Sequence, residues 1–119
     1  MSDTAAIAAY PALAGVIALR DAGWTFLHRD LIEGVPTTIE GFRLWHGGWI
    51  DAVRVRGDAD AMALRTDGAD PPGIVWETSG TLADVIDALR VLPSPDHPSA
   101  PRLVRATGPI PTPWTGAAG

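Results

Sequence analysis

The stretch that decides the fold is residues 37–66, TTIEGFRLWHGGWIDAVRVRGDADAMALRT. It contains three runs rich in apolar, aromatic and β-branched residues, and these runs are separated by Gly47-Gly48 and by the GDAD sequence at 57–60. Paired glycines between such runs favour a two-residue hairpin turn, because the common hairpin turns need positive φ angles. We therefore expect three consecutive antiparallel strands, at 37–46, 49–56 and 61–66.

The segments on both sides of this stretch extend the pattern. Residues 24–32 and 74–78 have strand character, and residues 11–22 have an apolar stripe at helical spacing. A second helix is expected after Thr81, with Thr81 as N-cap and Asp84 at the third helical position, and Pro93 ends it. The order α-β-β-β-β-β-α predicts an α+β fold, in which an antiparallel β-meander of about five strands carries two helices on one face as a two-layer sandwich.

The chain divides into an α+β domain at 1–92 and a proline-rich C-terminal tail at 93–119. The tail contains seven of the eleven prolines, so we expect no regular strand pairing there, because proline lacks the backbone donor. Apolar residues could still strap the tail to the domain, and they are Leu103, Val104, Ile110 and Trp114.

Composition excludes several classes of protein. The chain has no cysteine, which rules out disulfides and thiolate metal sites, and its net charge of −5 opposes binding to nucleic acid. No apolar run is long enough for a membrane span, and Asp3 precedes any basic residue, unlike in a signal peptide. We expect a cytoplasmic protein with no nucleic-acid or membrane partner. All nine basic residues are Arg, which indicates codon bias in a GC-rich bacterium.

The expected turns set a register for the sheet. A two-residue turn at Gly47-Gly48 places His46 opposite Trp49 and Phe42 opposite Val53. A four-residue loop at 57–60 places Arg56 opposite Ala61. The predicted core face then consists of Phe42, Leu44, Val53, Val55, Met62 and Leu64. The predicted outer face consists of Ile39, Gly41, Arg43, Trp45, Ile50, Ala52, Arg54, Arg56, Ala61, Ala63 and Arg65.

This outer face is the candidate interaction surface. Its binding residues are Arg43, Trp45, Arg54, Arg56 and Arg65. One interpretation is a solvated face on which Arg stems cover an apolar floor. The other is a recognition surface, because Trp and Arg dominate binding hot spots. A protein partner, a second copy in a homodimer, the tail or an anionic ligand would each fit it.

A second candidate site is a pocket between the helices and the sheet, using His28, His46 and Asp51. A His–Asp pair suits general-base chemistry, but the chain has no cysteine and no serine in a nucleophile elbow. A hydrogen-bonded pair at the rim of the sheet is the plainer interpretation. The Asp residues at 58, 60, 67 and 70 are typical of turns, so we expect neither a metal nor a cofactor.

The leading functional hypothesis is a non-enzymatic protein-interaction or regulatory accessory module, acting through its Arg/Trp-bearing open sheet face or its tail. The alternative is a small-ligand-binding domain or minor enzyme with a pocket between helices and sheet. A fully packed core favours the first hypothesis, whereas a pocket on the order of several hundred Å³, lined by His and Trp, favours the second.

Overall fold

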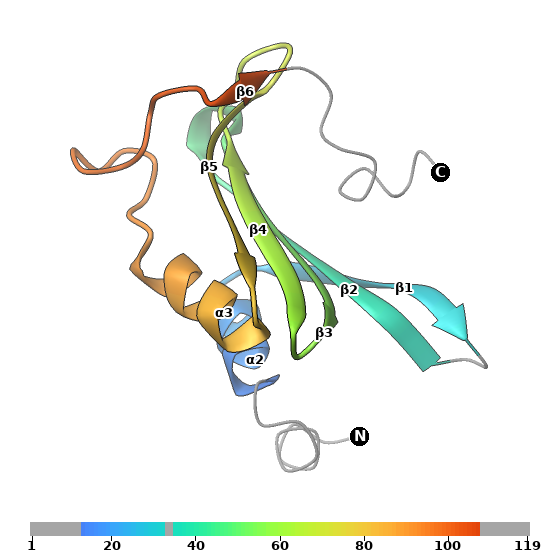
Figure 1. Cartoon of the computed structure of the whole chain (residues 1–119). Coiled ribbons are helices and arrows are strands. Elements are labelled where there is room, and N and C mark those ends of the chain that lie inside the picture. Colours follow the sequence, from blue (N-terminus) through green and yellow to red (C-terminus); the bar gives the residue numbers. More distant parts are fainter. Residues whose placement is uncertain (1–12, 33–34, 108–119) are drawn as a thin grey trace.

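The computed structural model describes residues 13–32 and 35–107 (Figure 1). Five strands form an antiparallel meander, in which each strand pairs with the next along the chain: β1 (Thr25–Ile32), β2 (Val35–Leu44), β3 (Ile50–Gly57), β4 (Asp60–Thr66) and β5 (Gly73–Gly80). Helices α2 (Leu13–Asp21) and α3 (Leu82–Val91) pack against one face of this sheet. The predicted α+β fold is confirmed. No helix in the described part of the chain is long and apolar enough to cross a membrane.

The main core lies between the helices and the sheet. Helix α3 presents Leu82, Val85, Ile86 and Leu89 on one stripe, at the i, i+3, i+4 and i+7 spacing of an amphipathic helix. Helix α2 adds Val16 and Leu19. The sheet side of the core is made by small and β-branched residues, Val53, Val55, Ala61 and Ala63. Small side chains on the sheet let the helices approach closely.

The register between β2 and β3 differs by one residue from the prediction. Leu44 lies opposite Ile50 and Phe42 opposite Ala52, so the expected pairing of Phe42 with Val53 is wrong. The loop contains three residues, the 3-10 turn η1 (His46–Gly48), and Trp45 N–H donates to the Trp49 carbonyl at 2.8 Å. Both glycines still supply the positive φ angles of the turn, 80° and 83°. One extra loop residue shifts the register by one.

A long-range contact accompanies this longer turn. Gly68, in the loop between β4 and β5, packs against Gly47 and Gly48, and a Cβ atom on Gly68 would collide with the Gly47 carbonyl. The two loops therefore touch backbone to backbone at one end of the sheet. Such a contact depends on the tertiary structure and leaves no local signal in residues 45–49.

The register between β3 and β4 also differs from the prediction. Val55 lies opposite Ala61 and Gly57 opposite Asp60, with a bulge between Val55 and Gly57. The turn consists of residues 58–59, so the expected four-residue loop is wrong.

Because of these two shifts, the side chains of β2 and β4 lie on the faces opposite to those predicted, whereas the side chains of β3 lie on their predicted faces. The helix face of the sheet consists of Ile39, Gly41, Arg43, Asp51, Val53, Val55, Ala61, Ala63 and Arg65. The open face, on the other side, consists of Phe42, Leu44, Ile50, Ala52, Arg54, Met62 and Leu64. Val53 and Val55 are core residues as predicted. Phe42, Leu44, Met62 and Leu64 are on the opposite face from the one predicted.

The C-terminal segment returns to the sheet. Strand β6 (Ala106–Thr107) pairs with Gly73 and Ile74 at the start of β5, and Arg105 N–H donates to the Ile74 carbonyl at 2.7 Å. This short ladder departs from the expectation of an unpaired tail, and it forms at residues that are not proline. Ile110 and Trp114 lie outside the described residues.

The N-cap of α3 gives a direct stability test. Thr81 Oγ1 accepts a hydrogen bond from Asp84 N–H at 3.1 Å, as predicted from the sequence. We expect Thr81→Ala to lower the free energy of unfolding by about 1 kcal/mol, because a helix N–H loses its acceptor. Urea denaturation measures the loss. Ser79→Ala, a hydroxyl deletion two residues earlier at an exposed position, is the control and should have little effect. The reverse order of the two losses would assign the cap to Ser79.

Candidate functional site

A buried ion pair lies on the helix face of the sheet. Asp51 on β3 and Arg65 on β4 are directly opposite in register. Arg65 Nε donates to Asp51 Oδ1 at 2.6 Å, and Nη2 donates to Oδ2 at 2.9 Å. Arg65 is fully buried and Asp51 is 3% exposed. This two-pronged geometry is the strongest form of an arginine–carboxylate pair.

The remaining hydrogen-bonding groups of the pair also have partners. Arg65 Nη1 donates to the Pro93 carbonyl at 2.6 Å, just beyond α3. Asp51 Oδ2 accepts a second hydrogen bond, from Trp45 Nε1 at 3.0 Å. Removing two charges from water costs several kcal/mol per ion, and such a pair is tolerated when further hydrogen bonds satisfy its free groups. Asp51 and Arg65 therefore hold the sheet, the segment after α3 and the Trp45 side chain in one arrangement.

Trp45 supports a second arginine. The Arg43 Cζ atom lies 4.1 Å from the centre of the Trp45 ring, within cation–π distance, and the Arg65 Cζ atom lies 5.7 Å from it. Stacking orients the planar guanidinium of Arg43 and leaves its in-plane N–H donors accessible. Among the residues that the structure describes, Arg43 makes no hydrogen bond or ion pair.

Arg43, Trp45 and Asp51 line a cavity of about 310 Å³ between the sheet and the ends of both helices. We call it the arginine–tryptophan pocket. Its other polar lining group is Arg90, in the last turn of α3. Its apolar wall comes from α2, α3 and the residues that follow them, mainly Ala18, Ala22, Trp24, Leu89 and Leu92. A volume near 300 Å³ is at the small end for ligand sites.

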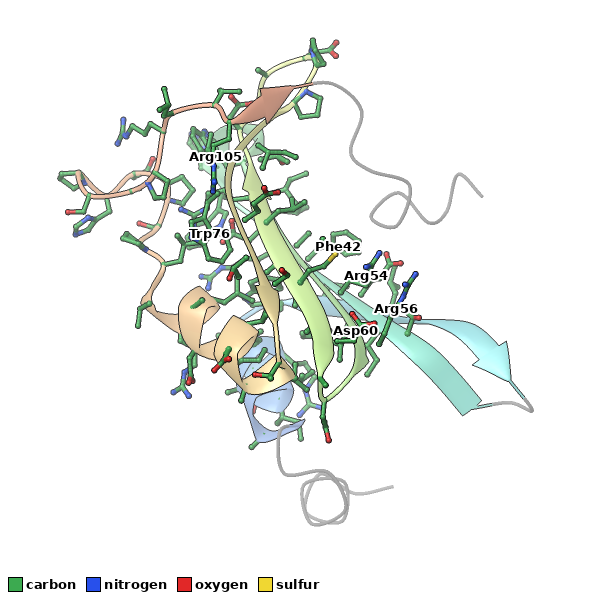
Figure 2. All side chains as sticks on the ribbon, in the orientation of Figure 1. Phe42, Arg54, Arg56, Asp60, Trp76 and Arg105 are labelled. Atoms are coloured by element: carbon green, nitrogen blue, oxygen red, sulfur yellow. The ribbon has the colours of Figure 1, made fainter. Side chains whose placement is uncertain are left out.

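The structure separates the five residues of the predicted interaction face. Arg43 and Arg65 are on the helix face, and Trp45 points to the same side through its bond to Asp51. Arg54 is on the open face, and Figure 2 shows Arg54 and Arg56 on the same side of the sheet as Phe42. The prediction of one shared face is wrong, because the one-residue register shifts place the side chains of β2 and β4, including Arg43 and Arg65, on the helix face, whereas Arg54 on β3 stays on the open face. Arg65 is also fully buried, so it offers no surface to a partner.

Arg54 is itself largely buried, at 7% exposure, and its Nη2 lies 3.0 Å from Met62 Sδ. Burial lowers the pKa of Arg54 below its ordinary value, and nearby Arg56 lowers it further, whereas Asp60 and Glu40 raise it. Glu40 lies directly opposite Arg54 on β2. These charges therefore balance one another locally on the open face, away from the pocket.

His46 is not among the described residues that line the pocket. His46 is exposed in η1 and makes no hydrogen bond to Asp51, whose described partners are Arg65 and Trp45. The expected His46–Asp51 pair is wrong, because the three-residue loop turns Trp45 toward Asp51 instead. The backbone of His28 pairs with Ile39, and its side chain lies outside the described residues. Among the side chains described, no three His, Asp or Glu residues are grouped to hold a metal ion.

Sequence reasoning missed two members of the pocket. Arg90 has the ordinary appearance of a basic residue in the last turn of a helix, where it complements the helix dipole. The sequence predicts Trp24 as the first residue of a strand, whereas in the structure it is buried and lines the pocket. Nothing local marks either residue, because both reach the pocket only through helix–sheet packing.

Comparison with known proteins adds no residue assignment to this site: no protein-family model matches the chain, and no similar curated protein or solved structure was found.

The buried ion pair gives the second stability test. We expect Asp51→Ala to lower the free energy of unfolding by about 3–5 kcal/mol, because it leaves the Arg65 charge buried without its carboxylate. The control is Asp21→Ala, which removes the carboxylate of the exposed Arg20–Asp21 pair at 3.3 Å. That change should cost less than about 1 kcal/mol. Urea denaturation followed by tryptophan fluorescence measures both, and equal losses would contradict the structural role of Asp51.

Proposed function

We propose that this protein is a non-enzymatic binding module that holds an anionic group in the arginine–tryptophan pocket. One observation carries the proposal. The Arg43 guanidinium is fixed on the Trp45 ring at 4.1 Å with its donors not engaged by any described residue. The carboxylate of the pocket lining, Asp51, has both oxygens occupied by Arg65 and Trp45. An anion from outside supplies the acceptors that Arg43 lacks.

The charge around the pocket supports an anion as well. The whole chain carries a net charge of −5, yet the pocket and its buried pair combine Arg43, Arg65 and Arg90 with a single carboxylate, Asp51. Distant acidic residues are screened by salt beyond about 8–10 Å, so the nearby arginines dominate the field inside the pocket. This local reversal of sign favours anions over cations.

The polar lining favours binding over catalysis. Arginine is always protonated in proteins, so Arg43 and Arg90 cannot act as general bases. Asp51 is held in an ion pair, and an indole N–H is a donor only. The described lining therefore offers charge and shape to a ligand, but neither a nucleophile nor a proton acceptor that is free to react.

A titration tests this function. In ¹⁵N-labelled protein, sodium acetate and inorganic phosphate should shift the Trp45 indole N–H resonance, because an anion on Arg43 changes the environment of the stacked ring. Arg43→Gln should weaken the response at least about tenfold by removing a charged donor. Arg102→Gln, on the segment after α3, is the control and should leave it unchanged. No shift with either anion would refute the proposal.

The homodimer expected from the sequence stays a prediction, and one observation favours it as a second candidate function. Leu44 is 76% exposed, and with Phe42, Gly23 and Thr25 it lines an apolar hollow of about 430 Å³ on the open side of the sheet. An exposed apolar patch of this kind is typical of a contact site, and a second copy would bring the same patch in a two-fold arrangement.

Sedimentation tests the dimer. The wild-type chain should sediment at twice its monomer mass, and Leu44→Asp should shift it to the monomer by placing a charge in the interface. Leu103→Asp is the matched control, since Leu103 is 84% exposed but lies outside the sheet. A monomeric wild type, or a dimer indifferent to Leu44→Asp, would exclude this interface.

An accessory or regulatory role in a GC-rich bacterium and a cytoplasmic location also stay proposals. They are supported by composition alone: Arg without Lys, no cysteine and a net negative charge.

A further inference from the structure

We infer that the ligand of the arginine–tryptophan pocket is a small organic monocarboxylate with an apolar body. The inference deepens the proposed function and rests on it, because it specifies the anion that the pocket holds. Three features of the pocket carry it: the acceptors already in use, the net charge at the helix ends and the shape of the apolar wall.

The acceptors near the pocket are already engaged, which disfavours a cation. Asp51 accepts three hydrogen bonds, two from Arg65 and one from Trp45. Three backbone carbonyls at this end also have partners: Ala18 accepts from Ala22, Leu19 accepts from Ala22 and Trp24, and Leu89 accepts from Leu92. An ammonium group would find few oxygens to accept its protons, whereas a carboxylate meets the unengaged donors of Arg43.

The ends of the helices favour one negative charge over two. Both α2 and α3 have their C-terminal ends at the pocket, at Ala22 and Leu92. Each helix C-terminus has the effect of about half a negative charge, so the two together offset roughly one of the two positive charges of Arg43 and Arg90. The net charge that a ligand meets in the pocket is then close to one positive charge. It matches a carboxylate better than a doubly charged phosphate monoester.

The apolar part of the lining fits an apolar body. Ala18 and Ala22 are four residues apart, so their methyl groups face the cavity as one shallow strip. Leu89, Leu92 and the buried Trp24 add larger apolar side chains to the lining. Small residues on α2 leave a slot beside the leucines, where a ring or branched chain would lie with its carboxylate toward Arg43.

The volume limits the size of that body. Liquid water occupies about 30 Å³ per molecule, so a cavity of about 310 Å³ holds about ten waters. A ligand of about ten non-hydrogen atoms therefore fills the space. An aryl or branched alkyl acid of this size can bury its body and keep its charge on the arginines.

The experiment uses 3-phenylpropionate as the probe, with binding to the full chain measured by calorimetry and by the Trp45 indole N–H shift. Four matched compounds separate the features: 3-phenylpropanol lacks the charge, 3-phenylpropylamine reverses it, acetate lacks the body and phenyl phosphate carries two charges. We expect 3-phenylpropionate to bind at least tenfold more tightly than each of the four. Its affinity should fall as salt is raised, because the arginine contact is electrostatic.

Three variants locate the site. Arg43→Gln should weaken 3-phenylpropionate at least tenfold. Ala22→Leu, at an exposed position on the wall, should weaken 3-phenylpropionate while leaving acetate unchanged, because it fills the slot but keeps both arginines. Ala18→Leu provides the same test from the preceding turn. Arg56→Gln, on the other side of the sheet, is the control and should change neither. Circular dichroism confirms that each variant is folded.

The outcomes separate this inference from the proposed function. If acetate binds through Arg43 as tightly as 3-phenylpropionate does, the inference of an apolar body is wrong, whereas the proposed anion binding is still supported. If phenyl phosphate binds more tightly, the single charge is wrong and anion binding again stands. Three results would overturn both the inference and the proposed function. They are tighter binding of the amine or the alcohol, an equal loss of affinity in Arg56→Gln and Arg43→Gln, and no binding of any anion.

Discussion

The ion pair between Asp51 and Arg65 is the interaction on which the rest of this structure depends. It joins two neighbouring strands through two hydrogen bonds, ties β4 to the segment after α3 through the Pro93 carbonyl, and holds Trp45 by its indole N–H. Both charges are buried, so the arrangement is stable only when every one of these partners is in place. A sheet register shifted by one residue would put Asp51 and Arg65 on opposite faces and leave the charge that stayed in the core without its partner. The pair therefore disfavours the alternative register strongly, although burial of charge adds little net stability by itself.

The candidate site is connected to this pair through Trp45. Asp51 holds Trp45, Trp45 orients Arg43, and Arg43 faces the pocket beside Arg90. Only the outer members of this chain of contacts have donors to offer a ligand, while the inner members are fully engaged. A site of this kind is preorganised, because its charged group is oriented by ring stacking and by buried hydrogen bonds before any ligand arrives. The same arrangement explains why one carboxylate within a cluster of arginines does not cancel the attraction for an anion.

The two faces of the sheet divide the polar and apolar residues in an unusual way. The helix face carries the main core and also the buried Asp51–Arg65 pair, whereas the open face carries a second, smaller apolar cluster of Ala52 and Leu64 with Phe42, Met62 and Ile74 packed on them. Alternation along β3 and β4 is therefore not a simple pattern of apolar inside and polar outside. Val53 is in the core, as the predicted register requires. The predicted faces of Phe42 and Met62 are wrong, because the three-residue loop and the bulge after Val55 shift β2 and β4 by one residue against β3.

The sequence by itself determined the order of the five meander strands, the capped start of α3 at Thr81, and the presence of a hairpin at Gly47-Gly48, because each depends on propensities and turn chemistry within a few residues. Only the tertiary structure decided the register, and with it the site. Gly68 packs against Gly47 at the three-residue hairpin loop, and this contact involves a residue distant in sequence. No local sequence pattern predicts the bulge after Val55. Since side chains alternate with a period of two, one extra residue in the first loop and the bulge after Val55 placed the residues of β2 and β4 on the face opposite to the predicted one, while those of β3 kept their predicted face. That change placed Asp51 beside Arg65 and Trp45 and made a pocket out of residues that the sequence had spread over an open surface.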